Sequence, residues 1–217
     1  FLTFPNLIDE SVFVDGVAKT RQHRDEIRRA LEVDDATSLW VCPARLEKFK
    51  GLHLFLPLLE GIEGMRMLVA GEGSLRSAFQ EMIDEKNLPV QLLGQQGESE
   101  MVRLYAAADL FVLPSLSDPS PLSVIEAGAA RLPLLASRRV GNFADVVDDG
   151  VNGWGYDADD PPSNAGLIRQ IAATGRARLA EMGEASAERY ARIFDSDACC
   201  ERLARGIREV WERCRPT

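Results

Sequence analysis

Four charged residues have types and spacing that could bind a ligand or act on it. Arg45 and Lys50 follow a short apolar run and precede Gly51, which we expect to open a helix, in the segment VCPARLEKFKG. Two cations beside the free N–H groups of a helix start can bind an anion such as a phosphate. Asp118 opens the turn DPSP, and Glu126 lies in the otherwise apolar stretch LSVIEAGAA, which has helical period. Carboxylates at such positions can accept hydrogen bonds from ligand hydroxyls.

The pattern of apolar runs predicts the elements that position these residues. From Ser38 onward, runs of strand length alternate with stretches of helical period, which is typical of βα units on a parallel sheet. The sequence predicts an α/β fold, a Rossmann-like, doubly wound parallel sheet of about six strands with helices on both faces. A helical tail follows over about 165–217. The expected strands are 39–42, 67–70, 90–93, 110–113, 134–136 and 153–156, with helices from about Gly51, Ser74, Glu98, Pro121 and Phe143.

Such a sheet would bring the four charged residues to one edge. Ligands on doubly wound sheets bind beyond the carboxyl ends of the strands, and Arg45, Lys50 and Asp118 each follow an expected strand. Glu126 would lie at the rim of the apolar stripe of the next helix. Taken alone, each residue has a plainer explanation, since most Arg, Lys and Glu side chains simply reach water. Together, two cations for phosphates and two carboxylates for hydroxyls indicate a site for a sugar nucleotide.

Glycines follow two other expected strands. Gly71 in GEGS and Gly94 after VQLL would allow a ligand to approach the backbone, but either could equally form a tight turn. A GxG motif without its third glycine is weak evidence for a dinucleotide. We expect Ser74 to cap the helix after GEGS, and Ser120 to cap the helix that would begin at Pro121.

Composition excludes several classes of protein. The formal net charge is −9 and the basic residues are scattered, which argues against binding to nucleic acid or to an anionic membrane surface. No apolar run approaches the length of a transmembrane helix. The chain starts FLTFPNLIDE, without Met or a basic leader, so we expect a fragment of a longer chain. The cysteines show no CxxC pairing, which indicates reduced thiols of a cytoplasmic protein and no metal site: Cys42, Cys199, Cys200 and Cys214.

In colinear order, these segments resemble the donor-binding half of the retaining group 1 (family 4) glycosyltransferases of the GT-B type. The matching segments are PNLIDESVF, ARLEKFKGLHLF, MLVAGEGSLR, VQLLG, MVRLYAAADLFVLPS, an acid followed after seven residues by another acid, and DDGVNGW. The resemblance covers nearly the whole chain. It implies that residues 1–217 form the C-terminal nucleotide-sugar-binding domain, with 1–37 as a lead-in segment. It also implies that the N-terminal acceptor domain is absent from this chain, which alone would be inactive.

The resemblance implies a role for each charged residue. Glu126 would hold the ribose hydroxyls of the donor. Asp118 would lie near the transferred sugar. Arg45 and Lys50 would bind the diphosphate and offset the charge that develops on it as it leaves. Asp118, Arg45 and Lys50 are therefore the expected catalytic residues of a hexosyltransferase-like enzyme.

The resemblance also implies backbone contacts to the donor. The N–H groups of Leu122 and Ser123 would bind phosphate, the base would rest near Leu93 and Gly94, and Gly71 would lie beside the donor. We expect no metal or other cofactor, because the protein supplies the cations. The expected partners are a nucleotide sugar and the missing Rossmann domain, through which alone the protein would touch a membrane, and no nucleic acid. The expected setting is cell-surface polysaccharide biosynthesis in the cytoplasm.

The chain departs from the family pattern at the first acid. Asp118 stands where the family generally has Glu, and Pro119-Ser120-Pro121 replaces the usual glycines, which removes two backbone donors. Two alternatives therefore stay open. One is a nucleotide-sugar epimerase on the same scaffold, although His23 and His53 lie outside the motif loops. The other is a nucleotide-sugar-binding module without turnover.

Two helical segments lie outside the expected sheet. The charged stretch from about Lys19 to Leu31 is expected to be a helix whose surface is solvated. The last helix carries an apolar stripe that, by resemblance, would cross back to the missing domain and so be left partly uncovered here. The stripe consists of Leu203, Ile207, Val210 and Trp211.

Overall fold

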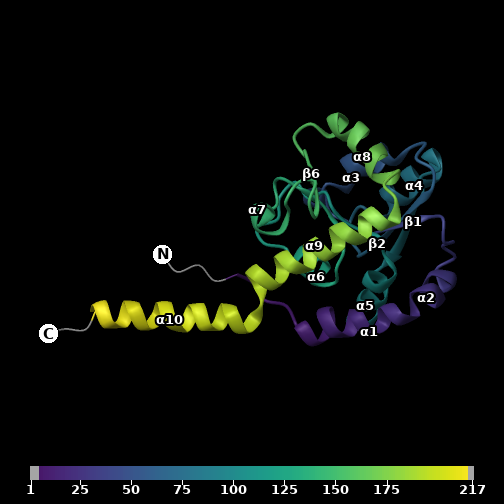
Figure 1. Ribbon diagram of the computed structural model, residues 1–217. Helices are drawn as coiled ribbons and strands as arrows, with labels where there is room; N and C mark the ends of the chain where they lie inside the picture. Colours follow the sequence, from purple (N-terminus) through teal and green to yellow (C-terminus); the bar gives the residue numbers. More distant parts are fainter. Residues whose placement is uncertain (1–4, 215–217) are drawn as a thin grey trace.

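The computed structural model describes residues 5–214 and contains one parallel sheet of six strands (Figure 1). Their order is β3-β2-β1-β4-β5-β6, so the chain builds the sheet outward from β1 in one direction and from β4 in the other. This confirms the predicted fold class. The strands are β1 (Ser38–Pro43), β2 (Met65–Ala70), β3 (Val90–Gly94), β4 (Leu110–Leu113), β5 (Leu134–Ser137) and β6 (Gly153–Tyr156).

Helices cover both faces of the sheet because its side chains alternate between two cores. In β1, Leu39 and Val41 belong to one core, whereas Trp40 and Cys42 belong to the other. The first core is covered by the lead-in segment and by α5 (Glu98–Ala107), α6 (Leu122–Ala129), α7 (Phe143–Val146) and α9 (Arg176–Phe194). The second is covered by α3 (Leu52–Phe55), the 3-10 turn Leu56–Leu59, α4 (Arg76–Lys86) and α8 (Ala165–Ala172).

The lead-in segment packs on the first core beside α5 (Figure 1). Val17 and Ile27 are buried there, and only the outer side, with Lys19 and Asp25, is exposed. The expectation of a solvated helix therefore holds for the outer side only: the apolar residues are few, but they fall on one face and complete the core. The segment consists of a π-helical turn (Ser11–Gly16), α1 (Val17–Thr20), a 3-10 turn (Arg21–His23) and α2 (Arg24–Ala30). Residues 1–4 lie outside the described part.

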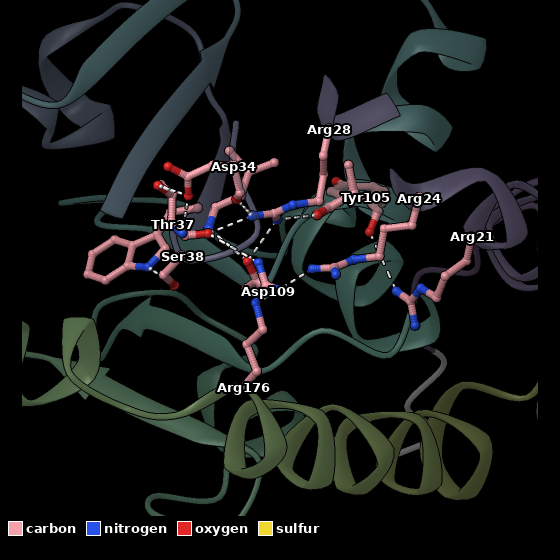
Figure 2. A network of polar contacts seen from close by, with 12 residues as sticks. Arg21, Arg24, Arg28, Asp34, Thr37, Ser38, Tyr105, Asp109 and Arg176 are labelled. Atoms are coloured by element: carbon pink, nitrogen blue, oxygen red, sulfur yellow. Dashed lines mark hydrogen bonds and ion pairs between the residues drawn. The ribbon is translucent and has the colours of Figure 1, made fainter. Parts of the chain in front are cut away.

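A buried ion pair fastens this segment to the amino ends of β1 and β4 (Figure 2). Asp109 immediately precedes β4, and its Oδ2 accepts from the backbone N–H of Leu39 at 2.8 Å and from Arg28 Nη1 at 3.0 Å. The side chain of Arg28 is 1% exposed. Its Nη2 donates to the carbonyls of Asp34 at 2.8 Å and Thr37 at 2.5 Å. One guanidinium thus joins the helix, the loop before β1 and the start of β4.

The C-terminal helices behave differently from each other. α9 packs across α6, whereas α10 (Ser196–Cys214) extends away from the body of the protein (Figure 1). Along α10, Ile207 and Val210 are each 56% exposed, Trp211 is 63% exposed, and Leu203 is half-buried. This confirms that the apolar stripe of the last helix is left uncovered within this chain.

Two further expectations concern membranes and thiols. Within residues 5–214, no helix combines the length and the apolar character that a bilayer crossing requires. All four cysteines are free thiols, as predicted, and Cys42 and Cys199 are buried.

The Arg28–Asp109 pair yields a test of the fold. Arg28→Met should lower the free energy of unfolding by about 3 kcal/mol, because it removes a positive charge that compensates the buried carboxylate of Asp109. The control is Arg29→Met, whose side chain is on the exposed side of the same helix and should change stability by less than about 0.5 kcal/mol. Urea unfolding measures both. Equal effects of the two substitutions would contradict the assigned role of Arg28.

Candidate functional site

The predicted site residues lie beyond the carboxyl ends of adjacent strands. β1 and β4 pair with each other at the centre of the sheet, and the chain leaves them in opposite directions along it. This is the switch point at which doubly wound sheets open a crevice for ligands. Arg45 and Lys50 follow β1, whereas Asp118 and Glu126 follow β4. The topology thus places all four predicted residues in the two segments that leave the sheet at this switch point.

The loops after β1 and β4 are joined through their backbones. The carbonyl of Phe49 accepts from the N–H groups of Leu116 at 2.8 Å and Ser117 at 3.3 Å. Gly51 has a φ of 74°, and a Cβ added there would overlap the carbonyl oxygen of Pro114. Only glycine fits this left-handed position at such close approach. Gly51 therefore lets the two loops pack together, which brings Lys50 beside Asp118.

Lys50 and Asp118 form an ion pair in the structure. Nζ of Lys50 donates to Oδ2 of Asp118, and each side chain is 13% exposed. Arg45 lies nearby and is exposed: its Cζ is 5.0 Å from the ring centroid of Phe49, and Nζ of Lys50 is 5.5 Å from the same centroid. Arg45 and Lys50 therefore lie beside one aromatic ring, and Asp118 joins them through its ion pair with Lys50.

Sequence reasoning missed Phe49 and the pairing of Lys50 with Asp118. An aromatic residue between two lysines in KFK was the available signal for Phe49, since a ring face attracts cations. The ion pair had no local signal, because its partners are far apart in the chain.

Glu126 is half-buried in α6, and its partner is Tyr105 of α5. The hydroxyl of Tyr105 donates to Oε2 of Glu126 at 3.1 Å, and it lies 3.4 Å from the carbonyl oxygen of Ser123. Burial raises the pKa of the Glu126 carboxyl, and the hydrogen bond from Tyr105 opposes that shift. Within residues 5–214, no protein group donates to the other oxygen, Oε1, so it remains available to a ligand.

Tyr105 was not predicted from the sequence. It is fully buried, and its ring packs edge-on against Phe13 with centroids 6.1 Å apart. A tyrosine in the apolar stretch MVRLYAAADLF has a polar tip that needs a partner, and that requirement was the signal that could have linked it to Glu126.

The start of α6 differs from the prediction. The helix begins at Leu122, and Pro121 is its N-cap with no side-chain hydrogen bond. Ser120 does not cap it: its Oγ and its carbonyl accept from Nδ2 of Asn6 at 3.1 Å and 3.3 Å. The capping role of Ser120 was therefore wrong, because the side chain meets the lead-in segment instead. The N–H groups of Leu122 and Ser123 have no acceptor within the helix, as a phosphate contact would require.

The glycines after β2 and β3 have a packing role. A Cβ on Gly71 would overlap the carbonyl of Ala44, and the N–H of Gly71 donates to the carbonyl of Gly94 at 2.8 Å. The carbonyl of Leu93 accepts from Nε2 of Gln96 at 2.9 Å. Close backbone packing therefore explains Gly71, and the carbonyls of Leu93 and Gly94 already have donors within the chain. Their contacts with a donor remain a prediction.

The expected cap of α4 was also wrong. The helix begins at Arg76, and Ser74 instead donates from its N–H and its hydroxyl to the carboxylate of Glu47, each at 2.8 Å. This bidentate contact ties the turn after β2 to the loop that carries Arg45 and Lys50.

Metal-ligating side chains do not gather at this edge. Across the described part of the chain, no group of three or more His, Cys, Asp and Glu side chains is placed to hold a metal ion. The polar groups assembled here suit an anion with hydroxyls attached.

Comparison with known proteins identifies the family. The sequence profile described as "Glycosyl transferases group 1" matches residues 23–189. The chain belongs to the group 1 glycosyltransferase family. It is 30% identical over 196 residues to the D-inositol 3-phosphate glycosyltransferase of Corynebacterium diphtheriae, an alignment that covers 85% of this chain and 45% of that protein. This group 1 chain spans about half the length of the curated relatives that it matches.

Solved structures show the same fold. A glycosyltransferase from Rickettsia africae superposes with a TM-score of 0.80 at 15% identity, over 97% of this group 1 chain and 57% of that one. HepE of Anabaena, solved in complex with UDP-glucose, superposes with a TM-score of 0.76 at 19% identity, over 95% and 57% of the two chains. At these identities the likeness concerns the fold.

The contact between Tyr105 and Glu126 allows a prediction about how stability depends on pH. Tyr105→Phe keeps the packed ring but removes the donor that favours the ionised carboxylate, so the pKa of Glu126 should rise further. A carboxyl with a raised pKa binds more protons in the folded state, so stability falls as pH rises from the unfolded to the folded pKa. The window of falling stability should therefore extend to higher pH in the variant.

NMR titration of the Glu126 side-chain carboxyl measures this shift directly. The same titration of the unsubstituted chain provides the reference. An unchanged or lowered pKa of Glu126 in Tyr105→Phe would contradict the assigned contact.

Proposed function

We propose that this chain is the donor-binding half of a retaining glycosyltransferase, which transfers a sugar from a nucleoside diphosphate sugar to an acceptor. The observation that carries the proposal is the gathering of Arg45, Lys50 and Asp118 beyond β1 and β4 in a chain of the group 1 family. Two cations and a carboxylate at the switch point of the sheet fit a diphosphate joined to a sugar.

The diphosphate would lie against Arg45, Lys50 and the start of α6. Arg45 is exposed and has no carboxylate partner among the described residues, so its guanidinium is free to form paired hydrogen bonds with phosphate oxygens. The uncapped N–H groups of Leu122 and Ser123 would add to this contact. As the bond to the sugar breaks, charge grows on the leaving diphosphate, and these fixed donors would stabilise it.

The nucleoside and the sugar would lie on either side of the diphosphate. Glu126 would bind the ribose hydroxyls through Oε1, with Tyr105 holding its other oxygen. Asp118 would face the transferred sugar, oriented by Lys50. Because the positive charge of Lys50 is partly neutralised by Asp118, Arg45 is the cation that is more available to bind phosphate.

The chain would need a second domain for transfer. It spans about half the length of its curated relatives, and the uncovered stripe on α10 fits a surface that a missing acceptor domain would cover. We therefore expect this chain alone to bind the donor without transferring its sugar. We propose a cytoplasmic enzyme of cell-surface polysaccharide synthesis. HepE was solved with UDP-glucose, which makes UDP the first nucleotide to test.

Binding of UDP and of uridine to two substituted chains tests the proposal. Arg45→Ala and Lys50→Ala should each weaken UDP binding about tenfold or more, because each removes a charged contact to phosphate. Binding of uridine should change much less. Lys48→Ala is the matched control, since Lys48 is an exposed cation of the same loop.

Isothermal titration calorimetry gives both affinities. If Arg45→Ala and Lys50→Ala weaken uridine as much as UDP, or if Lys48→Ala has the same effect, the diphosphate does not bind at this edge.

Asp118→Asn distinguishes a sugar contact from a nucleotide contact. In the full-length enzyme this change should reduce kcat by about 100-fold or more, because a charged group near the transferred sugar is lost. Affinity for UDP should be unchanged or higher, since Lys50 is released from its ion pair. Steady-state kinetics and UDP titration on the same variant measure both quantities. A parallel loss of UDP affinity would place Asp118 in the nucleotide pocket, and an unchanged kcat would remove it from the site.

A further inference from the structure

A second concentration of positive charge lies at the opposite, amino edge of the sheet. A cavity of about 250 Å³ opens there between the lead-in helices and the start of α9. Four arginines and one carboxylate supply its charged lining: Arg21, Arg24, Arg131, Arg176 and Asp109. We call this cavity the arginine pocket. In a chain with a net charge of −9, such a cluster does not follow from composition.

The carboxylate of Asp109 cannot neutralise these arginines. Its Oδ1 accepts from Arg24 at 2.5 Å, and its Oδ2 is already bonded to Arg28 and to the Leu39 N–H. Arg176 approaches Oδ1 only to 3.9 Å from its Nε. Figure 2 shows Arg24 and Arg28 of α2 and Arg176 of α9 directed at Asp109. A single carboxylate thus faces three guanidinium groups.

The other two arginines retain unused donors. Arg21 donates through Nη2 to the carbonyls of Ala130 at 2.6 Å and Tyr105 at 3.5 Å, and within residues 5–214 it has no carboxylate partner. Arg131 is half-exposed and pairs with Glu184 through one nitrogen, Nη1. Burial lowers the pKa of Arg21, and the charges of Arg24 and Arg131 lower it further, as expected where like charges meet without enough counter-charge.

Structural contacts account for only part of this arrangement. Arg28, 1% exposed and bonded through both terminal nitrogens, joins the lead-in segment to the sheet. Arg24 adds a bond to Asp109, and Arg21 adds one to the carbonyl of Ala130. The four lining arginines also border an open space that would hold several water molecules, since each occupies about 30 Å³. Arginine presents its donors in a planar fork that matches phosphate oxygens.

We propose that the arginine pocket binds a phosphate group carrying at least two negative charges, at a site separate from the donor edge. The anion would accept from Arg21, Arg131 and Arg176 and would offset the repulsion among them. It would thereby link the lead-in helices, the turn before β5 and α9. The volume admits either a free phosphate or the phosphate of a small ester, and the two sources can be separated by experiment.

Calorimetric titration of the chain with inorganic phosphate, pyrophosphate and glycerol phosphate, at constant ionic strength, tests this proposal. The background carries Arg45→Ala and Lys50→Ala, so that the donor edge does not contribute. Saturable binding of at least one probe is expected. Tighter binding of glycerol phosphate would assign a phosphate ester, and tighter binding of the inorganic anions would assign a free phosphate.

A matched pair of variants locates the binding site. Arg176→Gln should weaken binding about tenfold, and Arg131→Gln should weaken it in the same direction. Arg178→Gln removes the same charge from the same helix, but Arg178 is outside the pocket and donates to the carbonyl of Gly150, so the loss should be less than about twofold. Thermal unfolding without anion checks that each variant is folded.

Three results would overturn the proposal. The first is no binding of any probe, and the second is an equal loss of probe affinity in Arg176→Gln and Arg178→Gln. The third is that sodium chloride raises the unfolding temperature as much as the probe anion does at the same ionic strength. The donor-edge proposal stands or falls separately, because it is read from UDP binding by Arg45→Ala and Lys50→Ala.

Discussion

The adjacency of β1 and β4 is the constraint on which the rest of the structure depends. The ladder between them pairs Trp40 with Leu110 and Val41 with Phe111. Asp109 extends it: its N–H donates to the carbonyl of Leu39 at 2.7 Å, and its carboxylate accepts from the Leu39 N–H. Arg28 then holds that carboxylate in a site nearly closed to water. The amino ends of the two central strands are thus fixed by a charged, desolvated contact whose loss would be costly.

Fixing the strands at one end determines what can happen at the other. Beyond their carboxyl ends the chain diverges toward β2 on one side and β5 on the other, and the loops that carry Lys50 and Asp118 meet through the carbonyl of Phe49. The candidate donor site therefore depends on backbone contacts between two loops, and Gly51 is the residue that permits them. The candidate site and the buried ion pair thus lie at opposite ends of the same pair of strands.

The sequence was sufficient for the sheet and insufficient for the contacts between distant segments. The six strands were predictable because each is a short apolar run bounded by turn residues, and periodicity reports such runs directly. The caps at Ser74 and Ser120 were mispredicted because a serine before a helix has other acceptors and donors within reach, here Glu47 and Asn6. Local sequence does not indicate partners that lie in distant segments, so the Lys50–Asp118 pair could not be predicted either.

The most direct test of the central claim is a crystal structure of the chain with UDP bound. The account predicts that the diphosphate lies within hydrogen-bond distance of Arg45 and Lys50, and that the ribose hydroxyls contact Glu126. UDP bound with its diphosphate in the arginine pocket or elsewhere, leaving Arg45 and Lys50 without a phosphate contact, would contradict it.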